Sequence, residues 1–270
     1  MKYAYYCYHR KDDNMLETCI NSLRAVELKS ECQIIVCTDG VPEDFEKCLS
    51  EKYGVFWVKV PKLKMKNRRA TCKIEVLTTI AQTMKNDEDL ILVSDVDVYY
   101  QSDPFKPFAD YPDMDLGLTT RHYPHLFPIN GGIFYIRVNQ KTKNWLKWYI
   151  EQILIPTWRP YVQLRKNYHH EHYGLDWSVG QDFLIACWNC RYVLLDNIGL
   201  KITDVGPKYN YCPPVDLWKK KAFWAVREAI GKLDEVSIIH LKSDLKSMIY
   251  EPGLFPNATT HYPRGKTGWL

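Results

Sequence analysis

The chain has 270 residues, a formal net charge of +4 at pH 7, and a hydrophobic content of 46%. This composition supports a large packed core and excludes a disordered chain, and the mild charge does not indicate a nucleic-acid binder. No signal sequence or membrane-length apolar run is found and nine cysteines are scattered through the chain, so we expect a soluble, cytoplasmic protein without membrane insertion.

The first part of the chain alternates between strand and helix patterns. Strands are expected at 2–8, 33–38, 55–60 and 90–94, with helices at 13–25, 43–53 and 68–84. This alternation builds a mixed, mainly parallel sheet flanked by helices. Ligands of such sheets bind beyond the carboxyl ends of the strands. The sequence therefore predicts an α/β, Rossmann-like fold.

The second part is less regular. Strands are expected at 115–120, 130–137, 192–195 and 236–241, with helices at 142–155, from 180 onwards, and at 217–232. Residues 156–174 are aromatic, polar and rich in histidine, which is typical of a functional loop over a cleft. We expect one domain over 1–270, with two halves at 1–110 and 111–250 and a surface tail at 251–270.

Two carboxylates follow the apolar strand at 90–94. Along an extended chain alternate residues share a face, so Asp95 and Asp97 should point the same way while Val96 points into the core. This arrangement offers two hard oxygen ligands to one divalent cation, Mg²⁺ or Mn²⁺. The alternative is a solvated turn that happens to contain two aspartates.

Two glycines, Gly131 and Gly132, follow Asn130 where the strand at 130–137 begins. Paired glycines at the start of a strand let backbone or a ligand approach where a Cβ would collide. We expect this segment to border a ligand.

Four segments together resemble the metal-dependent nucleotide-sugar glycosyltransferases of the GT-A fold, particularly glycogenin-like and related retaining enzymes. The similar segments are the D-x-D strand at 92–99, the N-G-G-I-F strand at 130–137, Gln181-Asp182, and His240 to Lys246. They occur in the family's order and span most of the chain. The last segment departs from the family's H-x-x-G-x-x-K pattern, because Ser243 replaces the glycine.

This resemblance implies a metal site. Asp97 would coordinate Mn²⁺ or Mg²⁺ directly, Asp95 would contact the ribose or the metal, and His240 would complete the protein ligands. From the residues alone, a histidine that ends a buried strand is more often a core residue with satisfied hydrogen bonds.

The resemblance also implies a UDP-sugar donor, with a nucleotide-binding half at 1–110 and a sugar and acceptor half at 111–250. Lys246 and Lys242 would place positive charge on the leaving diphosphate, and Lys73 is a third cation that could reach it unless it lies on a solvated helix face. Residues expected to place the sugar near the reacting carbon are Asn130, Gln181 and Asp182, with Gly131 and Gly132 beside them.

The nucleoside has weaker candidates. Asp39, at the end of the second strand, could accept a hydrogen bond from a uracil N–H, although an Asp-Gly turn explains it as well. Tyr6 or Tyr8 could stack on the base.

The predicted function is metal-dependent transfer of a sugar from a UDP-sugar to an acceptor hydroxyl, with retention of configuration. The acceptor could be a glycan, a protein or a small molecule. The basic segment 59–73 and the loop 156–174 also suit DNA, so a modified DNA base is a further hypothesis. Alternatives are nucleotidyl transfer to a sugar phosphate, which the absence of a glycine-rich first loop disfavours, and a non-catalytic nucleotide-sugar-binding module.

Overall fold

The computed structural model describes residues 1–8, 13–26, 32–60, 68–84, 86–121, 129–154, 179–213, 219–256 and 258. The strands are β1 Lys2–Cys7, β2 Cys32–Thr38, β3 Val55–Lys59, β4 Leu90–Ser94, β5 Val98–Tyr100, β6 Leu116–Thr120, β7 Ile129–Arg137, β8 Ile202–Asp204 and β9 Ile238–His240. The α-helices are α1 Asp13–Val26, α2 Glu43–Tyr53, α3 Arg68–Thr83, α4 Lys106–Asp110, α5 Gln140–Leu154, α7 Val179–Asn189, α8 Arg191–Ile198 and α9 Lys219–Ala229. Two 3₁₀ helices are η2 Pro207–Asn210 and η3 Ser243–Tyr250.

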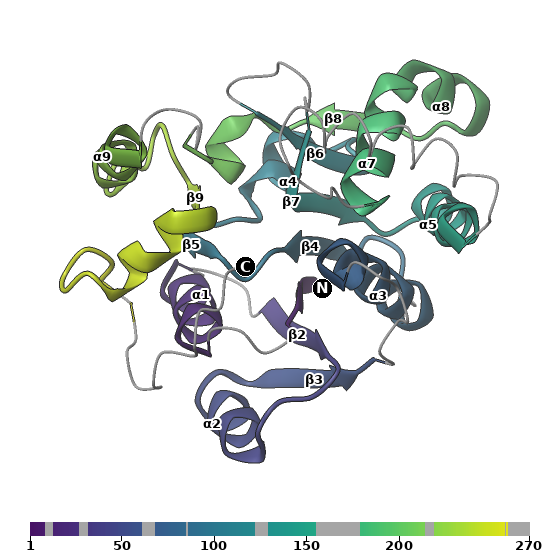
Figure 1. Cartoon of the computed structure of the whole chain (residues 1–270). Coiled ribbons are helices and arrows are strands. Elements are labelled where there is room, and N and C mark those ends of the chain that lie inside the picture. The colour runs from purple at the N-terminus through teal and green to yellow at the C-terminus, as the bar shows by residue number, and fades with distance from the viewer. Residues whose placement is uncertain are drawn as a thin grey trace.

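A seven-stranded sheet forms the centre, in the order β3-β2-β1-β4-β7-β6-β8 (Figure 1). Neighbouring strands are parallel except where β7 pairs antiparallel with both β4 and β6. The prediction of a mixed, mainly parallel sheet with flanking helices is confirmed. The antiparallel β7 matters for the site, because its first residues lie beside the last residues of β4.

Helices cover both faces of the sheet, and the strands divide their side chains between them. On β4, Leu92 packs in the core that α1 and α2 cover, while Ile91 and Val93 pack in the core that α3, α5 and α7 cover. This alternation follows from the two-residue period of a strand. β4 is therefore buried on both faces, as its continuous apolar run predicts.

A short ribbon of β5 and β9 stands beside the main sheet (Figure 1). Val98 lies opposite His240 in this antiparallel pair, and the Leu241 N–H donates to the Asp97 carbonyl at 2.8 Å. A third apolar cluster from α9, η3 and this ribbon packs around Tyr99. The ribbon thereby brings the end of the chain to the residues that follow β4.

One element differs in kind from the prediction. The prediction of a strand at 192–195 is wrong, because these residues lie in α8. This helix ends at Ile198 and is followed by Gly199 in the left-handed conformation. Tyr192, Val193 and Leu195 are exposed. A strand would need a neighbour to satisfy its backbone groups, whereas a helix satisfies them within the segment.

Several predicted features lie outside the described residues. They include the loop at 156–174, residues 61–67 of the basic segment 59–73 together with the side chains of 68–73, and most of the tail. Among the residues that are described, no helix is both long enough and apolar enough to cross a membrane.

Candidate functional site

The two aspartates lie where β4 ends, but not on an extended strand. Val96 and Asp97 form a bend between β4 and β5, so the expected strand geometry is wrong. Val96 still packs against the core, as predicted. The carboxylates are brought together by the bend and by the ribbon that follows it.

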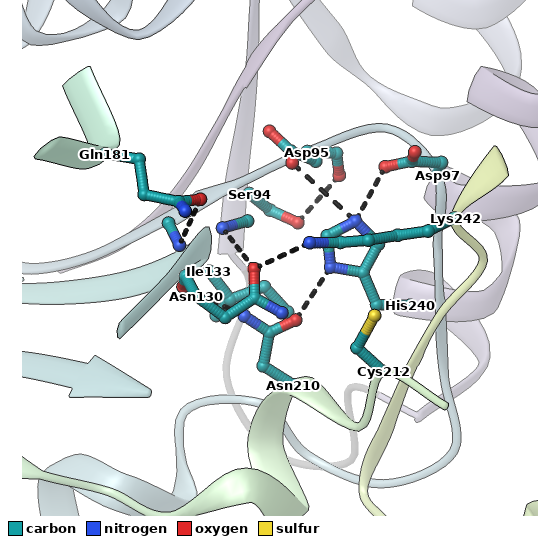
Figure 2. Close-up of polar contacts among 12 residues, drawn as sticks. Ser94, Asp95, Asp97, Asn130, Ile133, Gln181, Asn210, Cys212, His240 and Lys242 are labelled. Carbon is teal, nitrogen blue, oxygen red and sulfur yellow. Dashed lines mark hydrogen bonds and ion pairs between the residues drawn. The ribbon is translucent and has the colours of Figure 1, made fainter. Parts of the chain in front are cut away.

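Asp95, Asp97 and His240 converge at this bend (Figure 2). One ligand atom from each residue lies within 4.8 Å of the other two. His240 Nε2 is 3.1 Å from Asp97 Oδ1 and 3.7 Å from Asp95 Oδ2. The His240 side chain is 1% exposed, whereas that of Asp95 is 38% exposed, so the group opens to solvent on the Asp95 side.

Lys246 contacts the same carboxylate from η3. Its Nζ lies 2.6 Å from Asp97 Oδ2. Burial alone would raise the pKa of Asp97, but Lys246 and His240 outweigh burial and hold the pKa of Asp97 below its ordinary value. Burial lowers the pKa of His240, partly opposed by Asp97. Asp97 is therefore an anion near pH 7.

The donor set fits a divalent cation. Two carboxylates and a neutral imidazole are ligands that Mn²⁺ and Mg²⁺ accept, with the imidazole better suited to the transition metal. Across the ring, His240 Nδ1 contacts Asn210 Oδ1 at 2.8 Å, and an amide oxygen can only accept. Nδ1 therefore carries a proton, and Nε2 is the ring nitrogen that faces the two carboxylates.

Gly132 makes room for this group. A Cβ at Gly132 would lie 2.2 Å from His240 Cε1, 2.6 Å from His240 Nδ1 and 3.1 Å from Asp95 Oδ2. The Gly132 carbonyl accepts from the Asp95 N–H at 2.7 Å. The predicted close approach at the glycine pair is present, and what approaches Gly132 is the histidine and aspartate themselves.

Asn130, near the start of β7, links this strand to Lys242, which follows β9 (Figure 2). Its Oδ1 accepts from the Gly132 N–H and from Lys242 Nζ, each at 3.1 Å. Gln181 Oε1 accepts from the Gly131 N–H at 3.3 Å. Asn130 Nδ2 is buried and has no hydrogen-bond partner among the described residues. Burial lowers the pKa of Lys242.

The two tyrosines predicted to stack on a base lie elsewhere. Tyr6 is fully buried, and its hydroxyl lies 3.0 Å from that of Tyr100. Tyr8 is 2% exposed, packs near Phe45 and donates to Asp13. Neither ring offers a face to a nucleoside, so we correct this expectation.

Other predicted residues cannot be placed at the site from the described part of the chain. Asp39 follows β2, which is separated from β4 by β1 in the sheet. Lys73 lies on α3 and Asp182 on α7, and their side chains lie outside the description.

Two features of the site were not predicted from the sequence. Asn210, at the end of η2, contacts His240, and Lys246 contacts a carboxylate rather than standing free. No local signal marks Asn210, because its segment has neither strand nor helix periodicity. The H-x-x-x-x-x-K spacing did indicate Lys246, but not its partner.

Part of the chain matches a known family. Residues 67–153, which contain the D-x-D segment and all of β7, match the family described as nucleotide-diphospho-sugar transferase. A search of curated proteins finds no match.

Solved structures of similar fold are glycosyltransferases. The galactosyltransferase LgtC in complex with donor and acceptor sugar analogs is 15% identical with a TM-score of 0.53, over 97% of each chain. Mouse xyloside xylosyltransferase 1 is 13% identical with a TM-score of 0.53, over 88% of this chain and 96% of its own. GlyE of Streptococcus pneumoniae TIGR4 is 14% identical with a TM-score of 0.52, over 90% of this chain and 56% of its own.

The fold is therefore the GT-A fold of nucleotide-sugar glycosyltransferases. Residues 67–153 within it carry the sequence pattern of nucleotide-diphospho-sugar transferases.

Proposed function

We propose that the protein is a metal-dependent glycosyltransferase that moves a sugar from a UDP-sugar to an acceptor hydroxyl, with retention of anomeric configuration. The observation that carries this proposal is the convergence of Asp95, Asp97 and His240 at the carboxyl end of β4. This edge is where open α/β sheets bind their ligands.

In this proposal Asp95, Asp97 and His240 hold Mn²⁺ or Mg²⁺ beside the donor. When bound, the divalent ion would neutralise negative charge that develops on the departing diphosphate. Lys246 and Lys242 would add positive charge from the protein. Lys246 is already at the edge of the group, 2.6 Å from Asp97.

Asn130 is our candidate for holding the transferred sugar. A buried amide N–H without a partner costs roughly 1–3 kcal/mol, and a sugar hydroxyl would satisfy it. Asn130 Nδ2 is such a group among the described residues. Gln181, on the other side of Gly131, is held by the same backbone segment and would help to place the sugar. Asp182 and Lys73 remain candidates from the resemblance alone.

We propose a glycan as the acceptor. LgtC, one of the solved structures of similar fold, was determined with donor and acceptor sugar analogs. The DNA hypothesis depends on residues 59–73 and 156–174, which are mostly outside the described chain, so no observation favours it. Within the fold, residues 1–110 would serve mainly the nucleotide and 111–250 the sugar and acceptor.

A donor screen tests the proposal. UDP-, GDP- and dTDP-sugars are incubated with the protein and Mn²⁺ or Mg²⁺, and release of nucleoside diphosphate is measured with and without an oligosaccharide acceptor. We expect metal-dependent release of UDP that Asp97→Asn reduces at least 100-fold.

The matched control is Asp113→Asn, which removes an exposed carboxylate that pairs with Lys201. Its turnover should equal that of the wild type. Release of pyrophosphate from UTP and a sugar phosphate would indicate nucleotidyl transfer instead. Tight UDP-sugar binding without any turnover would indicate a non-catalytic module.

A further inference from the structure

The imidazole of His240 is held on the side opposite the carboxylates. His240 Nδ1 lies 2.8 Å from Asn210 Oδ1 (Figure 2). Both residues are almost fully buried, with exposures of 1% and 2%. Water therefore does not compete for this contact, and the amide oxygen of Asn210, which can only accept, requires a proton on Nδ1.

The orientation of the Asn210 amide follows from its other contacts. Its Nδ2 donates to Thr119 Oγ1 at 2.8 Å and to the Asn130 carbonyl at 3.2 Å. The Thr119 hydroxyl gives its own proton to the carbonyls of Asn130 and Ile133, at 3.0 and 3.1 Å, so it accepts from Asn210. Turning the amide over would bring two acceptor oxygens within 3.2 Å of each other. The oxygen must therefore face His240.

The backbone fixes the distance between these two side chains. The His240 N–H donates to the Tyr211 carbonyl at 2.8 Å, and the Tyr211 N–H donates to the Ile238 carbonyl at 2.9 Å. The end of η2 is thereby bonded directly to β9. Asn210 and His240 move as one unit, and neither side chain can turn away without breaking buried hydrogen bonds.

We propose that Asn210 is a positioning residue that holds a proton on His240 Nδ1 and so directs Nε2 toward the carboxylates as the metal ligand of the ring. Without Asn210, a neutral ring would gain most by placing its proton on Nε2, where Asp97 Oδ1 accepts at 3.1 Å. That tautomer cannot bind a metal through Nε2. The proposal concerns the proposed metal site and rests on that function for its consequence, but the proton on Nδ1 can be measured in the metal-free protein.

Nitrogen NMR of the metal-free protein tests the tautomer directly. Long-range ¹H–¹⁵N correlation spectra of ¹⁵N-histidine-labelled protein distinguish the two tautomers, and His240→Gln identifies the His240 signals among the eight histidines. We expect a proton on Nδ1 in the wild type and a proton on Nε2 alone in Asn210→Leu. An unprotonated Nδ1 in the wild type, or a protonated Nδ1 in Asn210→Leu, would overturn the proposal.

Asn210→Asp is the matched variant. Both substitutions remove the Nδ2 donor and its bonds to Thr119 and Asn130, so both should lose stability. Only Asn210→Leu also removes the acceptor for Nδ1–H. We therefore expect Asn210→Asp to retain the proton on His240 Nδ1. Loss of that proton in both variants would contradict a positioning role.

Mn²⁺ affinity, measured by electron paramagnetic resonance of free Mn²⁺, supplies the second measurement. We expect Asn210→Leu to bind Mn²⁺ about 10–100-fold more weakly, as for other partners of metal-bound histidines, and Asn210→Asp to bind nearly as the wild type does. Equal Mn²⁺ affinity in the wild type and both variants would show that Asn210 does not support metal binding. If the wild type carries the proton on Nδ1 but binds no Mn²⁺, the proposed metal-dependent function is contradicted. The assignment of the proton to Nδ1 would still hold.

Discussion

Lys246 places a positive charge against Asp97 before any metal is present. The Lys246 side chain is 28% exposed, and its Nζ is 2.6 Å from Asp97 Oδ2. Together with His240 it keeps the pKa of this buried carboxyl below its ordinary value, against the effect of burial. A metal that binds Asp97 must share or displace this ion pair. Lys246 therefore competes with the metal and, in the proposed complex, binds the diphosphate.

This competition predicts that one substitution, Lys246→Met, strengthens the binding of Mn²⁺ and weakens the binding of UDP. Lys246→Met should strengthen binding of Mn²⁺ alone about fivefold, because loss of a partly exposed ion pair is worth ~1 kcal/mol. It should weaken binding of UDP at saturating Mn²⁺ about tenfold, because a charge-assisted contact to phosphate is lost. Calorimetric titration measures both affinities.

The control for Lys246→Met is Lys106→Met, which removes an exposed lysine paired with Asp110. Neither affinity should change in that variant. A Lys246→Met protein that binds Mn²⁺ more weakly would show that Lys246 supports the metal site rather than competing with it.

At the scale of elements, β7 provides the surface on which the site is assembled. Because β7 runs antiparallel to β4, with Ser94 opposite Ile133, its first residues lie beside Asp95. Gly132 is the position where His240 and Asp95 both approach the strand. A side chain there would collide with the inflexible imidazole at 2.2 Å, so the ring would have to move.

Gly132→Ala should therefore disrupt the site. We expect Mn²⁺ affinity to fall at least tenfold, because displacement of His240 moves one of the three candidate ligands. Gly117→Ala on β6 is a matched control: it also introduces a methyl group into a crowded strand, but against Met114 and Tyr135. Both variants should lose stability in thermal unfolding, and only Gly132→Ala should lose the metal. Equal Mn²⁺ affinity in the two variants would refute this role of Gly132.

The elements with clear periodicity could be predicted from the sequence, and those defined by distant pairing could not. β4 and β7 carry apolar runs with recognisable ends, and both appear where expected. The β5–β9 ribbon has only three residues in each strand. Its pairing joins Val98 to His240, far along the chain, and no local pattern encodes such a contact.

The directions of several side chains could not be predicted from the sequence either. Tyr6 and Tyr8 come at the end of a strand whose edge binds ligands in this class of fold, so a role in base stacking was reasonable. The register of β1 instead turns both rings toward α1 and its core. The direction of the Asn210 amide is likewise set by Thr119 and Asn130, which only the folded structure brings together.

At the scale of the whole molecule, three distant parts of the chain meet at one edge of the sheet. Asp95 and Asp97 follow β4, Asn130 and Gly132 begin β7, and His240 ends β9. The sheet order places β4 next to β7, and the ribbon adds β9 to this pair. The D-x-D and histidine motifs predicted this meeting, and the topology supplies its physical cause.

The most direct test of the account is a crystal structure with Mn²⁺ and UDP, with manganese located by anomalous scattering. We predict one manganese peak at about 2.0–2.3 Å from a carboxylate oxygen of Asp97 and from His240 Nε2, with oxygens of both UDP phosphates around it. A peak bound to other residues, or UDP bound at this edge with no manganese between it and Asp97, would contradict the account.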